Sequence, residues 1–453
     1  MRERSRIVLH RPAARGRRGN GAMPTTTRGF LPFRSVVRQA AVAIGASIVA
    51  AWSTVYSGES LGAVTELISV NRSTGNAAGL SLDPTISGDG RYVAFASGST
   101  KLVPGDTNAA DDIFVRDRQT GRIERVSLSS SGLQADRFSI LPAISANGRY
   151  VAFVSYATNL ALPVDRMPHT YVHDRLTGVT ERVGFSNDAR YRPSLSADGR
   201  YVILGSWALR PREQMYFSVY VWDRLLGHAL ERVATNHASW PKSPVISGNG
   251  RYVAYEGYVV VGGALVVGVY IYDRFTGLTR RVDRNSNEEP GNLPGSEPSI
   301  SYDGRYVAFT SSATNLAVSD SNGATDVFVR DREAGTTTRV SVGPGARQAD
   351  GNSYRPAISA NGLRVAFVSD AGNLTSYDQN GVADIFLRDW QAGVTQLLSV
   401  DSNGQQGNRA SESPAINAGG RYVAFASSAS DLVSNDLNTS SDVFVRDRGG
   451  VLP

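Results

Sequence analysis

A nine-residue segment recurs seven times in this chain, and this repetition limits the possible folds more than any other feature. It reads SGDGRYVAF at 87–95 and returns with small changes at 145, 196, 247, 301, 359 and 417. Successive copies lie 51 to 58 residues apart. A unit of that size cannot bury its own faces, so the seven units must stack or close into one array.

Each unit contains four short runs that are rich in β-branched and aromatic residues and are bounded by Gly, Asn, Asp and Pro. The first run follows a proline, at positions 84, 142, 193, 244, 298, 356 and 414. An Asp-Gly or Asn-Gly turn, a strong hairpin signal, then leads into a second run such as RYVAF. The third run resembles DIFVRDR and the fourth resembles ERVSL. We therefore predict four antiparallel strands per unit and an all-β chain, because no helical period of useful length appears after residue 60.

Seven four-stranded units predict a single seven-bladed β-propeller. The last unit ends at DVFVRDRGGVLP without a fourth strand, whereas TELISV at 65–70 matches the fourth-strand sequence IERVSL at 123–128. We expect the strand at 65–70 to complete the last blade and close the ring, which covers two open sheet edges. The repeats are expected near 84–128, 142–183, 193–233, 244–282, 298–342, 356–400 and 414–447.

The strand pair P-x-I-S-x-D-G-R-x-V-A-F, followed by a strand I-F-V-R-D, resembles the WD-like repeats of TolB-type propellers, which are exported bacterial proteins. The resemblance covers all seven units, about 85% of the chain. It implies the propeller fold, but such propellers serve as binding platforms, as regulatory domains of peptidases and as sugar-active proteins. TolB itself has six blades and a separate N-terminal domain, so its partners are not carried over to this chain.

The N-terminal segment, 1–60, has a different composition from the repeats. It holds ten Arg and two Glu, so the remaining residues sum to −2 although the whole chain has a net charge of +6. A basic surface for nucleic acid is therefore not predicted in the propeller, 61–453. An uncharged stretch with the centre AAVAIGASIVAAW follows the Arg-rich lead, as in an export signal. An uncleaved anchor is the alternative, since about 20 uncharged residues approach the length of a membrane span.

Four of the loops between the second and third strands carry the pattern Asp-x-Asn-x-x-x-Asp. Oxygen-bearing side chains at positions 1, 3 and 7 resemble a calcium loop, which makes calcium the candidate cofactor. The alternative is that these side chains accept hydrogen bonds from the loop's own backbone. The twelve candidate ligands are Asp106, Asn108, Asp112, Asp320, Asn322, Asp326, Asp378, Asn380, Asp384, Asp436, Asn438 and Asp442.

The residue before each strand-opening proline differs from unit to unit and is expected to ring the central channel. These residues are Asp83, Leu141, Arg192, Ser243, Glu297, Arg355 and Ser413. The charged members Asp83, Arg192, Glu297 and Arg355 are candidates for binding a polar ligand at the channel mouth. By contrast, the Arg of each DGR turn and the Asp of each RDR run repeat in six units, for example Arg149 with Asp174, so we expect them to pair as part of the scaffold.

Sequence motifs for catalysis are missing. There is no Gly-x-Ser-x-Gly elbow, and the chain has no cysteine for a thiolate nucleophile, a disulfide or a lipid anchor. We predict an exported, non-catalytic and monomeric propeller, secreted or in the cell envelope, that binds a protein or cell-envelope ligand and touches a membrane only through an uncleaved N-terminal segment. The alternatives are a carbohydrate-active or lyase-type enzyme with its site in the channel, and a calcium-stabilised surface protein.

Overall fold

The structure is a computed structural model, and it describes residues 62–162, 167–184, 191–208, 216–226, 229–233, 242–261, 264–376 and 378–449. These residues belong to a compact unit that runs from Ser60 to Pro453. The predicted export segment, 1–60, lies outside the described residues. No helix in the described ranges is long and apolar enough to span a bilayer.

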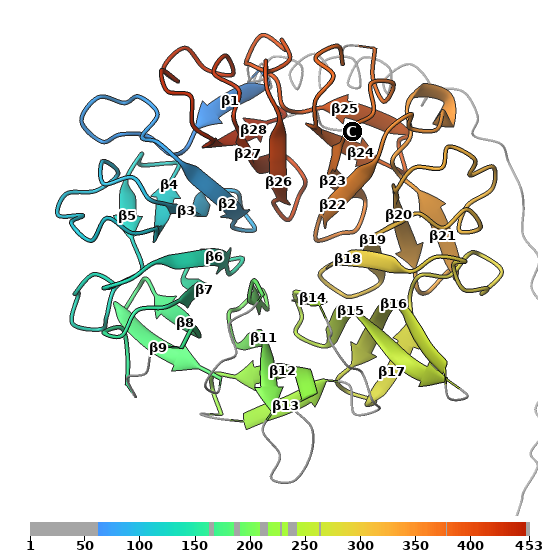
Figure 1. Ribbon diagram of the computed structural model, residues 1–453, viewed down its shortest axis with the longest axis horizontal. Coiled ribbons are helices and arrows are strands. Elements are labelled where there is room, and N and C mark those ends of the chain that lie inside the picture. Colours follow the sequence, from blue (N-terminus) through green and yellow to red (C-terminus); the bar gives the residue numbers. More distant parts are fainter. Residues whose placement is uncertain are drawn as a thin grey trace, which may run out of the picture. The chain divides into compact units, whose positions relative to one another are not determined.

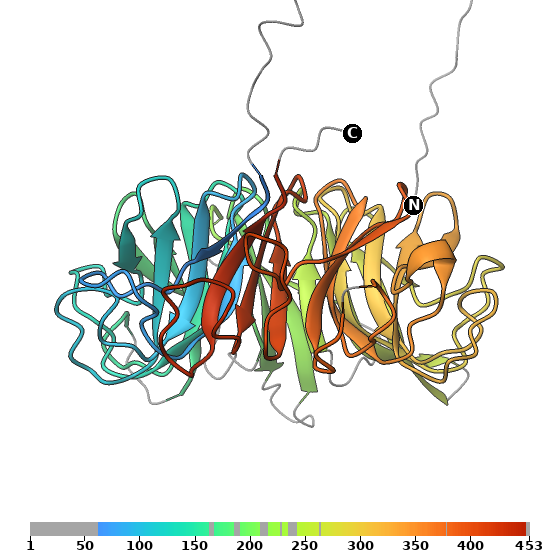
Figure 2. The same cartoon turned by 90° about the horizontal axis from the view of Figure 1, so that it is seen from above.

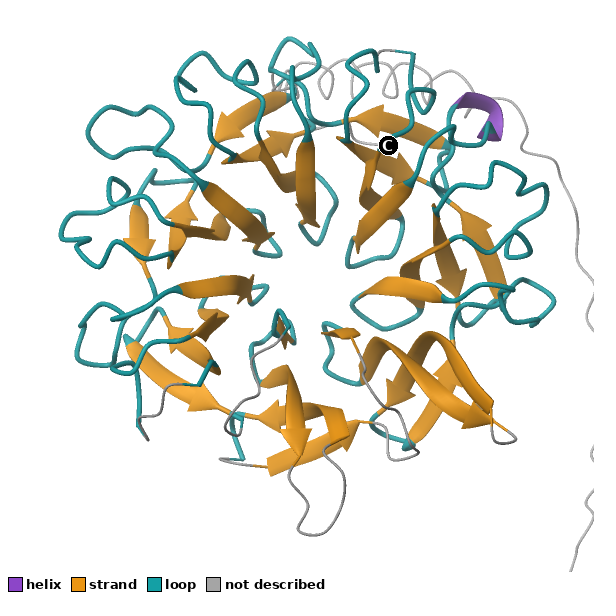
Figure 3. Ribbon diagram, in the orientation of Figure 1, coloured by secondary structure: helices purple, strands orange, loops and turns teal. Residues whose placement is uncertain are grey.

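Seven sheets of four antiparallel strands surround a common centre, so the predicted seven-bladed propeller is confirmed (Figure 1). Blade 1 consists of β2 (Ser81–Ile86), β3 (Tyr92–Ser97), β4 (Asp112–Asp117) and β5 (Ile123–Arg125). Blade 2 consists of β6 (Ser139–Ile144), β7 (Tyr150–Ser155), β8 (His169–Asp174) and β9 (Val179–Val183). Blade 3 consists of β10 (Ser194–Leu195), β11 (Tyr201–Ala208), β12 (Tyr216–Asp223) and β13 (Ala229–Val233). Blade 4 consists of β14 (Lys242–Ile246), β15 (Tyr252–Val261), β16 (Ala264–Asp273) and β17 (Leu278–Arg281). Blade 5 consists of β18 (Gly295–Ile300), β19 (Tyr306–Ser311), β20 (Asp326–Asp331) and β21 (Thr336–Arg339). Blade 6 consists of β22 (Ser353–Ile358), β23 (Arg364–Ser369), β24 (Asp384–Asp389) and β25 (Val394–Leu397). Blade 7 is β26 (Ser411–Ile416), β27 (Tyr422–Ser427), β28 (Asp442–Asp447) and β1 (Val64–Leu67). Among the described residues the only helical element is a 3-10 turn, η1 (Pro344–Ala346), which Figure 3 shows at the outer rim.

The N-terminal strand closes the ring, as the sequence predicts. β1 pairs antiparallel with β28, and Leu67 lies opposite Phe444. Just past β1, the backbone N–H of Ile68 donates to the carbonyl of Val443 at 2.7 Å. Ile68 is fully buried with residues of blades 7 and 1, so this strand fills the core at the junction of the chain's two ends.

In six blades the first strand contains its proline instead of following it, which differs from the expected order. In blade 3, β10 begins at Ser194, directly after Pro193, as expected. In blade 1, β2 begins at Ser81 and Pro84 lies inside it. The pairing of β2 with β3 shifts between Leu82 and Thr85, and the same irregularity recurs in blades 2, 4, 5, 6 and 7. A bulge accommodates a residue without an N–H, and these strands lie at the inner edge of each sheet, where a missing donor is tolerated.

Apolar side chains from neighbouring blades pack together at each junction. Strands such as β3 (YVAFAS) and β4 (DIFVRD) present buried residues on both faces, because each sheet is covered by a blade on either side (Figure 2). Between blades 4 and 5, for example, Val269, Val307 and Phe309 lie in one buried cluster. The ring therefore consists of similar interfaces and can tolerate differences at its loops.

The predicted Arg–Asp pairs form on every blade where they are expected. The six pairs, each with a closest N–O distance of 2.7 Å, are Arg91–Asp117, Arg149–Asp174, Arg200–Asp223, Arg251–Asp273, Arg305–Asp331 and Arg421–Asp447. In blade 6, Arg364 is one position later in the sequence and still reaches Asp389 at 3.1 Å. The Arg149 guanidinium holds the pKa of Asp174 at about 2. Repetition on all seven blades identifies these pairs as scaffold.

Candidate functional site

The residues before the seven prolines meet at the centre of the ring. All seven, from Asp83 to Ser413, line one pocket of about 530 Å³, together with five of the adjacent prolines. Six of them, all except Arg192, have positive φ angles between 47° and 56°. Non-glycine residues rarely adopt this conformation, and here the bulge at each proline imposes it. The scaffold thus presents one blade-specific side chain per blade to the channel.

The four charged channel residues form two separate groups. Arg192 lies 2.6 Å from Asp83, which belongs to a blade two places away around the ring. The backbone N–H of Arg355 donates to Glu297 Oε2 at 2.8 Å, and its guanidinium lies 2.7 Å from Glu412. Glu412 was not among the predicted ligands, although its position next to Ser413 could have drawn attention to it. The channel mouth therefore carries both charge signs, and its ion pairs are partly exposed.

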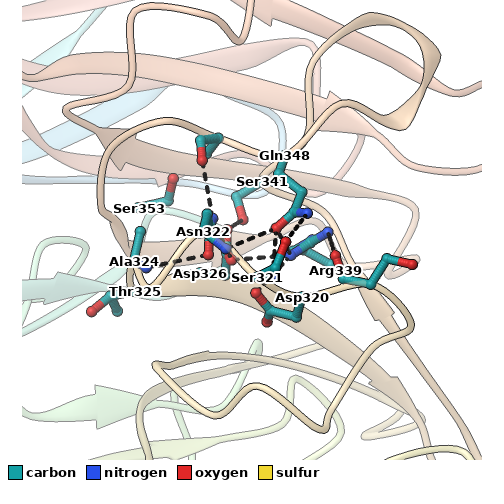
Figure 4. Close-up of polar contacts among 12 residues, drawn as sticks. Asp320, Ser321, Asn322, Ala324, Thr325, Asp326, Arg339, Ser341, Gln348 and Ser353 are labelled. Carbon is teal, nitrogen blue, oxygen red and sulfur yellow. Dashed lines mark hydrogen bonds and ion pairs between the residues drawn. The ribbon is translucent and has the colours of Figure 1, made fainter.

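The Asp-x-Asn loop of blade 5 shows what the repeated acids do (Figure 4). Asp326 is fully buried, and its Oδ1 accepts a hydrogen bond from Ser341 Oγ at 2.5 Å. Asn322 Nδ2 donates to Asp326 Oδ2 at 3.1 Å. Arg339 Nη1 lies 2.9 Å from Asp320 Oδ1 and 3.4 Å from Asp326 Oδ2, so a guanidinium lies between the two carboxylates.

Blade 1 repeats this arrangement with its own arginine. Arg125 Nη1 lies 3.1 Å from Asp106 Oδ1 and 3.3 Å from Asp112 Oδ2. Asn108 Nδ2 donates to Asp112 Oδ2 at 2.9 Å, as the equivalent asparagine does in blade 5. A calcium ion in the loop of blade 1 or blade 5 would have to displace an arginine that already neutralises the acids.

Blade 6 uses a glutamine in place of the arginine. Leu397 lies opposite Phe386, in the register position that arginine takes in blades 1 and 5. Gln406 Nε2 instead donates to Asp378 Oδ1 at 2.7 Å and to Asp384 Oδ2 at 2.8 Å, while Asn380 donates to Asp384. Three of the four predicted loops therefore fill the space between their carboxylates with a nitrogen of their own.

In blade 7 the acids have different neighbours. Asp442 accepts hydrogen bonds from Ser69 Oγ at 2.6 Å and from Asn438 Nδ2 at 2.9 Å. Asp436 Oδ1 accepts the backbone N–H of Asn438 at 3.3 Å, whereas its Oδ2 is buried and has no hydrogen-bond partner among the described residues. Burial raises the pKa of Asp442 to about 6, and the charge of Asp436 adds to this effect. These two carboxylates form the least compensated acidic pair among the four loops.

In blade 4 the buried acid and a small residue have exchanged positions, which the loop pattern in the sequence does not reveal. Gly268 takes the strand position of the buried aspartate, and Asp283 takes the place of the serine that bonds it in blades 1, 5 and 6. A Cβ at Gly268 would lie 2.6 Å from an Asp283 carboxylate oxygen, so the glycine makes room for the acid. Arg281 binds both oxygens of Asp283 at 2.8 Å. Alignment of the repeats shows the exchange, but only the contacts reveal that the acid is again paired.

Comparison with solved structures shows the propeller fold. The chain resembles the β-propeller domain of the trilobed protease from Pyrococcus furiosus, with a TM-score of 0.51 and 11% identity over 82% of this chain and 95% of that one. It also resembles the Pyrococcus horikoshii acylaminoacyl peptidase (TM-score 0.52, 11% identity, 81% of this chain), of which it spans about half, 51%. The chain resembles TolB from Acinetobacter baumannii more loosely, with a TM-score of 0.40 and 16% identity over 75% of this chain and 77% of that one. No protein-family profile and no curated protein matches the sequence.

Proposed function

We propose that this protein is an exported, non-catalytic propeller whose channel-mouth pocket binds a charged segment of a partner protein. The observation that carries the proposal is the convergence of all seven blade-specific residues on one pocket. The repeated positions build the scaffold, so recognition is assigned to the positions that differ.

The charges in the pocket favour a partner that carries both signs. The Arg192–Asp83 pair has side chains about one-third exposed, at 34% and 30%, and Arg355 and Glu412 are about half exposed. A partner's acidic and basic side chains can replace such partly hydrated pairs at small cost, whereas an apolar ligand would remove their remaining water without supplying a hydrogen bond. Asp83 and Glu297 each contact an arginine or a backbone N–H, an arrangement that suits charge recognition better than proton transfer.

Site-specific photo-cross-linking tests this proposal. A photoreactive amino acid replaces Leu141 in the channel pocket or, as a control, Leu176, which is 74% exposed on the turn after β8. We expect the exported protein to form one discrete cross-linked product in cells from the Leu141 position only. Arg192→Ala together with Arg355→Ala should reduce that product several-fold, whereas Arg122→Ala on the outer surface should not.

Stability measurements separate lost binding from lost folding. Because the Arg192–Asp83 pair is partly exposed, we expect Arg192→Ala to lower the free energy of unfolding by less than about 1 kcal/mol. Equal cross-linking from both positions, or a yield that does not respond to the two arginine substitutions, would contradict a binding site at the channel mouth.

A further inference from the structure

The equivalent positions of blade 7 explain why neither an arginine nor a glutamine contacts its two acids. Leu67 lies opposite Phe444 in the register that places Arg125 opposite Phe114. The bridge between Val70 and Ala77 corresponds to the bridge between Val400 and Gln406 in blade 6. Both positions that supply a donor in the other three loops therefore hold apolar residues, Leu67 and Ala77, in blade 7.

As a result, one carboxylate oxygen in blade 7 is buried without a hydrogen-bond partner among the described residues, which indicates a ligand that these residues do not supply. Asp436 is 5% exposed, and its Oδ2 has no hydrogen-bond partner in the described part of the chain. Asp442 is fully buried, and Asn438 links the two acids by donating to one oxygen of each. Buried carboxylates are normally paired with a cation or bound to a metal ion. In the other three loops a single nitrogen contacts one oxygen of each acid, which marks where a cation would lie in blade 7.

We propose that Asp436 and Asp442 bind one calcium ion in blade 7, and that the three other Asp-x-Asn loops bind none. Carboxylate oxygens are the ligands that calcium prefers. A surface pocket of about 580 Å³, lined by Asp401, Asp431 and Asp436, gives a cation an acidic path to the site. Backbone carbonyls and water must complete the shell, because no three His, Cys, Asp or Glu side chains gather as a metal site among the described residues. The affinity should therefore be low, with a Kd of about 10⁻⁴ to 10⁻³ M.

This site lies at the ring closure, which gives the ion a structural role. Asp442 opens β28, and its carboxylate binds Ser69, which follows the closing strand β1. The backbone N–H of Val443 also donates to Ser69 Oγ at 3.0 Å. A calcium ion on Asp442 thus stabilises the contact between segments from the two ends of the propeller, independently of what the channel binds.

Calcium titration of the chelator-treated full chain tests the proposal, by calorimetry and by melting temperature. We expect one ion per wild-type chain and a rise in Tm of about 2 to 3 °C at 10 mM Ca²⁺. Ala77→Gln, which copies Gln406, should abolish binding although both acids remain. Gln406→Ala should open a second site and raise the stoichiometry to two. Asp320→Asn, in a loop with its own arginine, should leave binding unchanged.

Two results would overturn the proposal. One is a wild-type chain that binds no calcium at 10 mM, as expected if the acids share a proton instead. The other is an Ala77→Gln chain that binds calcium with wild-type affinity. If Ala77→Gln lowers the Tm too far to be measured, Asp436→Asn provides the second test, and it should lose the site while the Tm in chelator stays within a few degrees of wild type.

Discussion

Replacement of Ile68 by alanine tests how much the closing strand stabilises the ring. Ile68 is fully buried in the cluster between blades 7 and 1, together with Phe95 and Phe114. The substitution removes three carbon groups at about 0.8 kcal/mol each, or roughly 2.5 kcal/mol. The cavity left in a packed interface raises the expected loss of unfolding free energy to about 3 to 4 kcal/mol.

Leu398 provides the matched control. Its backbone N–H bonds Ile385 at 2.7 Å as that of Ile68 bonds Val443, and it is equally buried, but its strand is joined to blade 6 by a hairpin. Guanidinium unfolding should show similar losses for Ile68→Ala and Leu398→Ala. Hydrogen exchange should differ, because β1 can leave β28 without unfolding a hairpin, so only Ile68→Ala should speed exchange at the amides of Ile68 and Val443. A loss below about 0.5 kcal/mol for Ile68→Ala beside a full loss for Leu398→Ala would refute the closure by β1.

Two further predictions concern the scaffold. The hydrogen bond from Arg251 lowers the pKa of Asp273 to about 2. The stabilisation from this carboxylate should therefore be complete above about pH 4 and be lost as the pH falls to 2. Between these pH values, the Tm of Asp273→Asn should fall less steeply than the Tm of the wild type. Gly199 has a φ of +73° and faces Tyr150, whose ring atom would lie 2.3 Å from an added Cβ, whereas Gly178 has a φ of +72° and open space around it. Gly199→Ala should therefore lower the Tm more than Gly178→Ala, which carries only the cost of the backbone conformation, about 1 kcal/mol, and equal effects would show that the contact with Tyr150 is unimportant.

Much of this architecture could be predicted because it rests on short-range signals that recur. The Asp-Gly and Asn-Gly turns give the hairpins, and the spacing of the copies gives the blade count. The match of TELISV to the fourth strand then indicates the closure. The placement of residues such as Asp83 and Arg355 at the channel also follows from the repeat, since equivalent positions in a ring face the same way.

The pairing of the acids could not be predicted from the loop pattern alone. The pattern treats Asp320, Asp378 and Asp436 alike, but their partners come from a different strand or from a loop more than 20 residues away. Arg339, Gln406 and the lack of either beside Asp436 determine what each loop does. Likewise, the bond from Arg192 to Asp83 crosses 109 residues of sequence and depends on channel geometry that no local signal encodes.

In blades 1, 4, 5 and 6 an arginine or a glutamine contacts the buried acid, whereas in blade 7 neither does. In blade 4 the acid is at a different position, Asp283, but Arg281 keeps the register position of Arg125 and Arg339 and still pairs with it. In blade 6, where leucine replaces the arginine, Gln406 donates to the acids. In blade 7 the equivalent position is Leu67, which is buried against blade 6 and anchors the closing strand through apolar contact. An arginine there would neutralise the acids but weaken that anchor. Binding an external ion instead neutralises the acids and keeps the anchor, and it makes the closure of the ring depend on calcium in the surroundings.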